Sequence, residues 1–140
     1  MGFTADKKAR LGIVASQFNL EITTVMSNEA AKEAGKLGAE VAVVLQVPGA
    51  YEIPFATAKL LQRKDIDAVA TVGAVIKGET KHDEAIMGAI CTELLRLSLQ
   101  YGKPVGLGIS GPGETEEQAR KRAEDYARRS VRAALHMAKI

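Results

Sequence analysis

The sequence predicts a three-layer α/β/α fold built around a four-stranded parallel sheet. Two observations predict it: four short apolar segments alternate with four helical patterns, and each apolar segment ends at turn-forming residues. Helices that follow every strand cover both faces of a parallel sheet. Right-handed crossovers then favour the flavodoxin-like strand order 2-1-3-4. With 140 residues and no internal repeat or linker, we expect one domain over 1–140.

The four strands are predicted from runs that are short, apolar and rich in β-branched residues. They are 11–15, 41–47, 67–76 and 104–109. Pro48-Gly49 ends the second strand, and Gly111-Pro112-Gly113 is expected to break the fourth. The polar segment 1–10 is expected to be a flexible N-terminal arm.

The first two helices are placed by their end signals. The first is expected from about Thr23 to Leu37, with Thr23 or Thr24 as its N-cap and Gly38 just past its end. The N–H groups in the first turn of a helix have no partner within the helix, so a proline, which lacks this group, costs nothing there. Pro54 therefore suits the start of the second helix, which is expected to run to about residue 63.

The last two helices are placed by their apolar spacing. The third carries apolar residues three and four apart, with Gly102 at its end: Ile86, Ile90, Leu94 and Leu97. The fourth opens with Thr115 and Gln118, the Thr-x-x-Gln form of a capping box. Its inward face is expected to consist of Ala119, Ala123, Tyr126, Ala127, Ser130, Val131 and Ala134.

Composition excludes several classes of protein. The formal net charge of +2 is too near neutral to indicate a nucleic-acid partner. The single cysteine, Cys91, excludes an internal disulfide and a thiol-based metal cluster, and we expect it to be a small core residue. No apolar run reaches the roughly 18 residues of a membrane span, so we expect a cytoplasmic protein with no membrane partner.

Positive charge gathers in the last quarter of the chain, and we expect most of it to be a solvated helix face, with one residue left as a candidate anion ligand. The residues are Arg120, Lys121, Arg122, Arg128, Arg129 and Arg132.

A candidate site follows from the predicted topology. Ligands of open α/β sheets bind beyond the carboxyl ends of the strands, near the switch point between the first and third strands. This rule brings together the segments 18–19, 49–52 and 74–82. Phe18 suits either stacking on a flat ligand or packing on a helix. Tyr51 favours packing, and Glu52 either stabilises a helix start or accepts hydrogen bonds from ligand hydroxyls.

The third of these segments has the groups for anion binding and proton transfer. Gly78-Glu79-Thr80 offers backbone N–H groups and a hydroxyl to a phosphate. Histidine is the residue type whose ordinary pKa is nearest to neutral, so His82 suits proton transfer, although a lone loop histidine is more often a surface residue. His136 has no visible partner and is expected to be a surface residue. The sequence contains no Walker loop, nucleophile elbow or clustered metal ligands, so we expect no metal.

Three segments closely resemble the lumazine synthase family. They are GIVASQFN at 12–19, VPGAYEIP at 47–54 and GAVIKGETKH at 73–82. The resemblance covers essentially the whole chain in order and spacing. The stretches GETKHDE at 78–84 and GISGPG at 108–113 are similar to the archaeal branch of the family.

The resemblance implies a function. Lumazine synthases condense 5-amino-6-(D-ribitylamino)uracil with 3,4-dihydroxy-2-butanone 4-phosphate, through an imine, with loss of phosphate, ring closure and dehydration. The family belongs to riboflavin biosynthesis, needs no metal or organic cofactor, and forms pentamers with active sites at subunit interfaces. Some members assemble twelve pentamers into a shell, and riboflavin synthase is the implied pathway partner.

The resemblance also implies a role for individual residues. The expected pyrimidine- and ribityl-binding residues are Phe18, Asn19, Ala50, Tyr51, Glu52, Ala74, Val75, Ile76 and Leu107. The expected phosphate-binding residues are Gly78, Glu79, Thr80, Arg122 and Arg129. His82 matches the proton-transfer residue of the family.

Four features depart from the usual family pattern. Asp83 stands where an aromatic residue often follows the histidine, and Leu107 where a neighbouring subunit's phenylalanine commonly covers the pyrimidine. Arg129 replaces a usual lysine, and the Gly111-Pro112-Gly113 loop is one residue longer than in bacterial relatives. Two other functions remain open: an archaeal-type riboflavin synthase, and a flavin- or pterin-binding carrier or shell without turnover.

Overall fold

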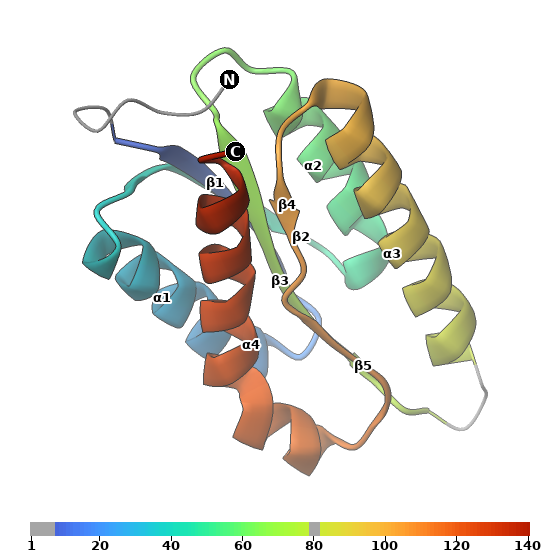
Figure 1. Ribbon diagram of the computed structural model, residues 1–140. Coiled ribbons are helices and arrows are strands. Elements are labelled where there is room, and N and C mark those ends of the chain that lie inside the picture. Colours follow the sequence, from blue (N-terminus) through green and yellow to red (C-terminus); the bar gives the residue numbers. More distant parts are fainter. Residues whose placement is uncertain (1–7, 79–81) are drawn as a thin grey trace.

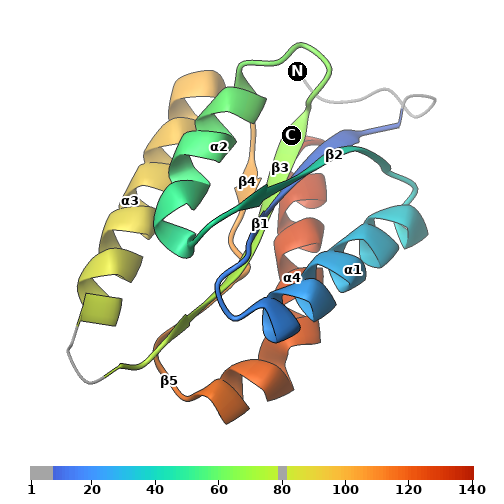
Figure 2. The same cartoon turned by 180° about the vertical axis from the view of Figure 1, so that it is seen from behind.

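The computed structural model describes residues 8–78 and 82–140 and has three layers. A parallel sheet lies between α1 and α4 on one face and α2 and α3 on the other, as the two opposite views show (Figures 1 and 2). The strands are β1 (Arg10–Ser16), β2 (Glu40–Val47), β3 (Ala68–Ile76), β4 (Val105–Gly106) and β5 (Ile109–Glu114). The helices are α1 (Leu20–Lys36), α2 (Ile53–Leu61), α3 (His82–Tyr101) and α4 (Glu116–Met137), with a 3-10 turn, η1 (Ala50–Glu52), before α2.

The strand order confirms the predicted topology, with one difference at the fourth strand. The order is β2-β1-β3-β4, and β5 also pairs with β3, further along it. The predicted fourth strand is therefore two short strands, and the prediction that Gly111-Pro112-Gly113 breaks it is wrong, because these residues lie within β5. Pairing moves from Ala74↔Ser110 to Ile76↔Glu114, so β5 carries extra residues as a bulge and then resumes its register.

The start of α1 also differs from the prediction. The N-cap position is Asn19, in the left-handed conformation at φ 64, so Thr23 and Thr24 lie inside the helix. Asparagine tolerates this conformation, and its carbonyl accepts the N–H groups of Ile22 and Thr23. The helix can therefore begin directly after β1. Gly38, at φ 77, lies just past its end as predicted.

The other boundaries are near those predicted. β1 already begins at Arg10, within the segment expected to be an arm, and the Arg10 N–H donates to Asp67 Oδ2 at 2.8 Å. Residues 1–7 of that segment lie outside the described residues. The capping box of α4 is confirmed: Thr115 Oγ1 accepts the Gln118 N–H at 3.1 Å, and Gln118 Oε1 accepts the Thr115 N–H at 2.9 Å.

The core consists of two clusters, one on each face of the sheet. Under α1 and α4 the inward residues of α4 are small, and six of the seven predicted ones are buried: Ala119, Ala123, Ala127, Ser130, Val131 and Ala134. Tyr126 is only partly buried. Under α3 the buried residues include Ile90, Leu94 and Leu97, with Ile86 and Cys91 partly buried beside them. No helix within the described ranges is long and apolar enough to span a bilayer.

Candidate active site

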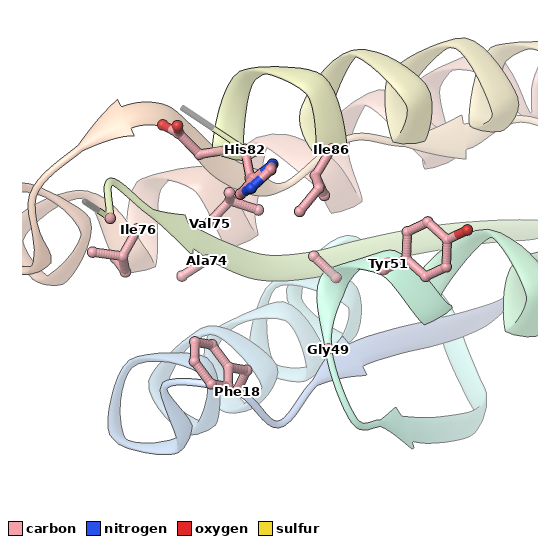
Figure 3. A pocket seen from close by; sticks show the side chains of 11 residues that line it. Phe18, Gly49, Tyr51, Ala74, Val75, Ile76, His82 and Ile86 are labelled. Atoms are coloured by element: carbon pink, nitrogen blue, oxygen red, sulfur yellow. The ribbon is translucent and has the colours of Figure 1, made fainter. Parts of the chain in front are cut away.

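A pocket of about 270 Å³ lies at the carboxyl ends of β1, β2 and β3, beside the start of α3 (Figure 3). Its lining residues come from all three predicted segments. They are Phe18, Gly49, Ala50, Tyr51, Ala74, Val75, Ile76, Gly78, His82, Asp83 and Ile86. The predicted convergence at the switch point is therefore confirmed.

Backbone hydrogen bonds hold Phe18 at the pocket. The Gln17 N–H donates to the Val47 carbonyl at 2.8 Å, and the Phe18 N–H donates to the Pro48 carbonyl at 2.9 Å. These bonds join the end of β1 to the end of β2. The Phe18 side chain is 68% exposed, so its ring is available to a ligand rather than packed on a helix. Tyr51, predicted to pack, is 72% exposed at the pocket, and for this chain that prediction is wrong.

Two predicted residues lie beside the pocket without lining it. Glu52 is the N-cap residue of α2, where the helix dipole favours a carboxylate. Its side chain lies over Gly49, since a Cβ built there would be 3.2 Å from Glu52 Oε1. Asn19 is half-buried, and its Nδ2 has no partner among the described residues.

His82 is the first residue of α3 and is exposed. Figure 3 shows His82 and Ile86 reaching toward β3 from the first turns of this helix, with Phe18 on the other side of the strand. A ligand that fills the pocket therefore meets an aromatic ring and an imidazole on different walls. Gly78 lines the pocket, whereas the predicted Glu79 and Thr80 lie outside the described residues.

The predicted residues of α4 and the β4–β5 connection do not line this pocket. Arg122 Nη1 lies 3.2 Å from Oε1 of the buried Glu114, on β5. Arg129 Nη1 lies 3.9 Å from Asp125 Oδ2. Leu107 is 46% exposed. Among the described residues that line the pocket, none is a lysine or an arginine.

The basic residues of α4 lie mostly on an exposed face, as predicted, and three of them also bind α1. Arg120, Arg128 and Arg132 form ion pairs with glutamates of α1 at 2.6, 2.9 and 2.7 Å. The hydrogen bond that Arg128 donates to the Glu29 carboxylate raises the pKa of the Arg128 guanidinium above its usual value. Each pair joins residues 99 positions apart, so a local sequence pattern contains no sign of it.

The residues 8–140 match the family model for 6,7-dimethyl-8-ribityllumazine synthase. The chain belongs to this family. A lumazine synthase of Staphylothermus marinus is 56% identical over 129 residues, which cover 92% of this chain and 86% of the relative. The enzymes of Metallosphaera sedula and Aeropyrum pernix are 52% and 49% identical, over 96% and 94% of this chain and 89% and 90% of theirs. The predicted resemblance is confirmed.

The lumazine synthase motifs thus separate into two groups within one chain. Phe18, the end of β3 and His82 line one pocket, whereas Arg122 and Arg129 lie on α4 and do not contribute to it. Asp83 lines the pocket as well, although the sequence indicated it only as a departure from the family pattern. Within the described ranges, no three His, Cys, Asp or Glu residues are grouped to hold a metal ion.

Proposed function

We propose that the chain catalyses the lumazine synthase reaction of riboflavin biosynthesis. It condenses 5-amino-6-(D-ribitylamino)uracil with 3,4-dihydroxy-2-butanone 4-phosphate and releases phosphate and water. The observation that carries the proposal is the family match over residues 8–140, which includes all the motif segments that line the pocket. A condensing enzyme gains much of its rate by holding two reactants together, and a pocket with walls from four segments suits that task.

Within the pocket, each wall takes one part of the substrates. The exposed Phe18 ring stacks on the pyrimidine, and the backbone of Ala74 to Ile76 contacts the heterocycle. Ala50, Tyr51 and Glu52, with Asn19, line the path of the ribityl chain. His82, an exposed imidazole at the pocket, moves protons during imine formation and ring closure.

The phosphate requires positive charge, and the site is completed by a second copy of the chain. A departing phosphate needs a fixed cation nearby, but no described lining residue is a lysine or arginine. Arg122 and Arg129 are 56% and 66% exposed on α4, and Leu107, between β4 and β5, is 46% exposed. These residues serve the pocket of the neighbouring subunit in a pentamer and bind the phosphate there together with the segment Gly78-Glu79-Thr80.

The same proposal includes the remaining features of the family. The amine and the ketone of the substrates supply the reactive groups of every step, so the reaction requires no metal or organic cofactor. The enzyme works in the cytoplasm, and riboflavin synthase consumes its product. The same proposal includes the assembly of twelve pentamers into a hollow shell.

The direct test mixes both substrates with the purified protein and follows lumazine absorbance together with phosphate release. We expect equal amounts of both products, at a rate well above the uncatalysed reaction. No acceleration contradicts the proposal. Riboflavin formed from the lumazine alone would instead identify a riboflavin synthase, and tight flavin binding without turnover would identify a carrier.

A mixing experiment tests the shared site. His82→Ala and Arg122→Ala chains are unfolded, mixed in equal amounts and refolded together. If each site takes His82 from one subunit and Arg122 from its neighbour, random assembly restores about a quarter of the wild-type sites. Each variant refolded alone is the control. Activity of the mixture equal to the average of the two controls means that both residues act within one chain.

A further inference from the structure

Asp83 and Gly113, which lie in the two segments where the sequence resemblance indicates a departure from the family pattern, are hydrogen-bonded to each other. In the structure the Gly113 N–H donates to Asp83 Oδ2 at 2.7 Å. Two segments that lie 30 residues apart in the sequence therefore form a single contact.

The bulge in β5 explains why this contact exists. Between the pairs Ala74↔Ser110 and Ile76↔Glu114, β3 contributes one residue and β5 contributes three. Extra residues of a bulge lie outside the paired register and need other hydrogen-bond partners. Gly113 has φ 76 and turns its N–H toward the start of α3, where the Asp83 carboxylate accepts it.

The surroundings of Asp83 hold its side chain in place. Asp83 is only 7% exposed, although it carries a carboxylate and lies in the first turn of a helix. The helix dipole and the charge-assisted hydrogen bond from Gly113 stabilise this charge. The next residue, Glu84, is also acidic and in the first turn, but it is exposed and makes no hydrogen bond or ion pair within the described part of the chain. The two neighbouring acids thus share the first turn of α3, but only Asp83 is buried, lines the pocket and accepts a hydrogen bond from β5.

We propose that Asp83 is the positioning residue of His82. It fastens the first turn of α3 to the β5 bulge, and this fixes the imidazole one residue earlier against the pocket that both residues line. The proposal rests on the proposed function, in which His82 moves a proton.

The first test compares Asp83→Ala, Asp83→Asn and Glu84→Ala under steady-state conditions. Asp83→Ala lowers kcat by about tenfold, because small displacements of a catalytic group are costly, and leaves the KM for the pyrimidine within about twofold. Asp83→Asn keeps an oxygen acceptor for the Gly113 N–H and retains most of kcat. Glu84→Ala behaves like the wild type. Equal losses of kcat in Asp83→Ala and Glu84→Ala would overturn the proposal. A negative charge in the first turn of α3 would then explain the loss without the hydrogen bond to Gly113.

A double-mutant cycle separates positioning from general damage. In a His82→Ala background, Asp83→Ala causes no further loss of kcat, because the residue that it positions is absent. A tenfold loss in both backgrounds means that Asp83 acts independently of His82. If Asp83→Ala does not fold, Asp83→Glu replaces it, since it keeps the charge but moves the acceptor by one methylene.

A third measurement does not depend on catalysis. The chain has two histidines, His82 and the exposed His136, so diethyl pyrocarbonate labelling followed by mass spectrometry has an internal reference. Asp83→Ala changes the labelling ratio of His82 to His136 at least twofold, and Asp83→Asn does not. An unchanged ratio overturns the positioning role even in an active enzyme. A changed ratio in a protein that makes no lumazine supports the link and refutes only the proposed function.

Discussion

The two faces of the sheet are closed in different ways. Under α1 and α4, small side chains allow the helices to approach the sheet closely, and ion pairs between the two helices cover the outside. Under α2 and α3 the buried side chains are larger, and the face ends in the pocket. Large apolar side chains also stay exposed on these helices, among them Phe55 at 72%, Leu95 at 64% and Leu99 at 76%.

This difference indicates that the two faces have different roles, one in stability and the other in binding or assembly. The buried side chains under α1 and α4 and the ion pairs that join these two helices are satisfied within one chain, so these contacts serve stability. The α2–α3 face leaves apolar surface and a pocket open, and exposed apolar surface of this kind marks sites of interaction. If the division holds, substitutions in the first set of contacts change unfolding, and substitutions on the open α2–α3 surface change binding or assembly.

The largest expected effect is that of Gly106→Ala, on the closed face. A Cβ at this position would lie 1.9 Å from the backbone oxygen of Ser130, on α4, so the helix must move away from the sheet. We expect the free energy of unfolding to fall by about 3 kcal/mol or more, as measured by urea titration at fixed protein concentration.

Gly35→Ala is the matched control for this substitution. Gly35 is on α1, on the same face, and a Cβ there meets no atom within 4 Å. We expect this variant to be unchanged or more stable by up to about 1 kcal/mol, because alanine favours helices. Similar losses in both variants would mean that the close contact of α4 with the sheet does not exist in solution.

The next effect concerns the ion pairs that join α1 and α4. Arg132→Ala leaves Glu33, whose side chain is only 6% exposed, without its cation, and we expect a loss of about 1–2 kcal/mol in unfolding free energy. Arg120→Ala breaks a pair with Glu21, which is 78% exposed, and should cost about 0.5 kcal/mol or less. Equal losses in the two variants, measured by urea titration, would show that burial of the glutamate does not decide how much an ion pair contributes to stability.

These features also show what a sequence can predict. The alternation of strands and helices, and the position of Phe18 and His82 at one edge, follow from local periodicity and the topology of parallel sheets. The start of α1 was predicted too late in the chain. Thr23 and Thr24 are residue types that often cap a helix, but Asn19 takes the N-cap position in a left-handed conformation. The bulge of β5 depends on register with β3, which local patterns do not contain.

The candidate site was predictable to the same extent. Residues at strand ends were found, since their place depends on topology alone. Asp83 was not found as a site residue, because its burial depends on a bulge 30 positions away. Arg122 was assigned by resemblance, and the structure pairs it with Glu114, outside the pocket. If Arg122 acts in a neighbouring subunit, as we propose, reasoning about one chain cannot place it.

The third effect compares two exposed phenylalanines on the open side. Phe18→Ala removes the stacking surface of the pocket, and we expect the KM for the pyrimidine to rise about fivefold, or about 1 kcal/mol, with an unchanged melting temperature. Phe55→Ala alters α2 outside the pocket, so it should leave this KM unchanged and weaken assembly, as measured by sedimentation. A rise in KM for both variants would contradict the separation of pocket and apolar surface.

The smallest effect tests how open the α2–α3 face is at Cys91, which packs partly against the core of α3. Burial raises the pKa of the Cys91 thiol above its usual value. The folded protein therefore holds the protonated thiol more strongly than the unfolded chain does, so this contribution to stability is present below the unfolded pKa and declines as the pH rises. We expect iodoacetamide to modify Cys91 several-fold more slowly at pH 8 than it modifies the urea-unfolded chain, with the difference narrowing at higher pH. Equal rates at pH 8 would show that the face opens around α3 even where its side chains are packed.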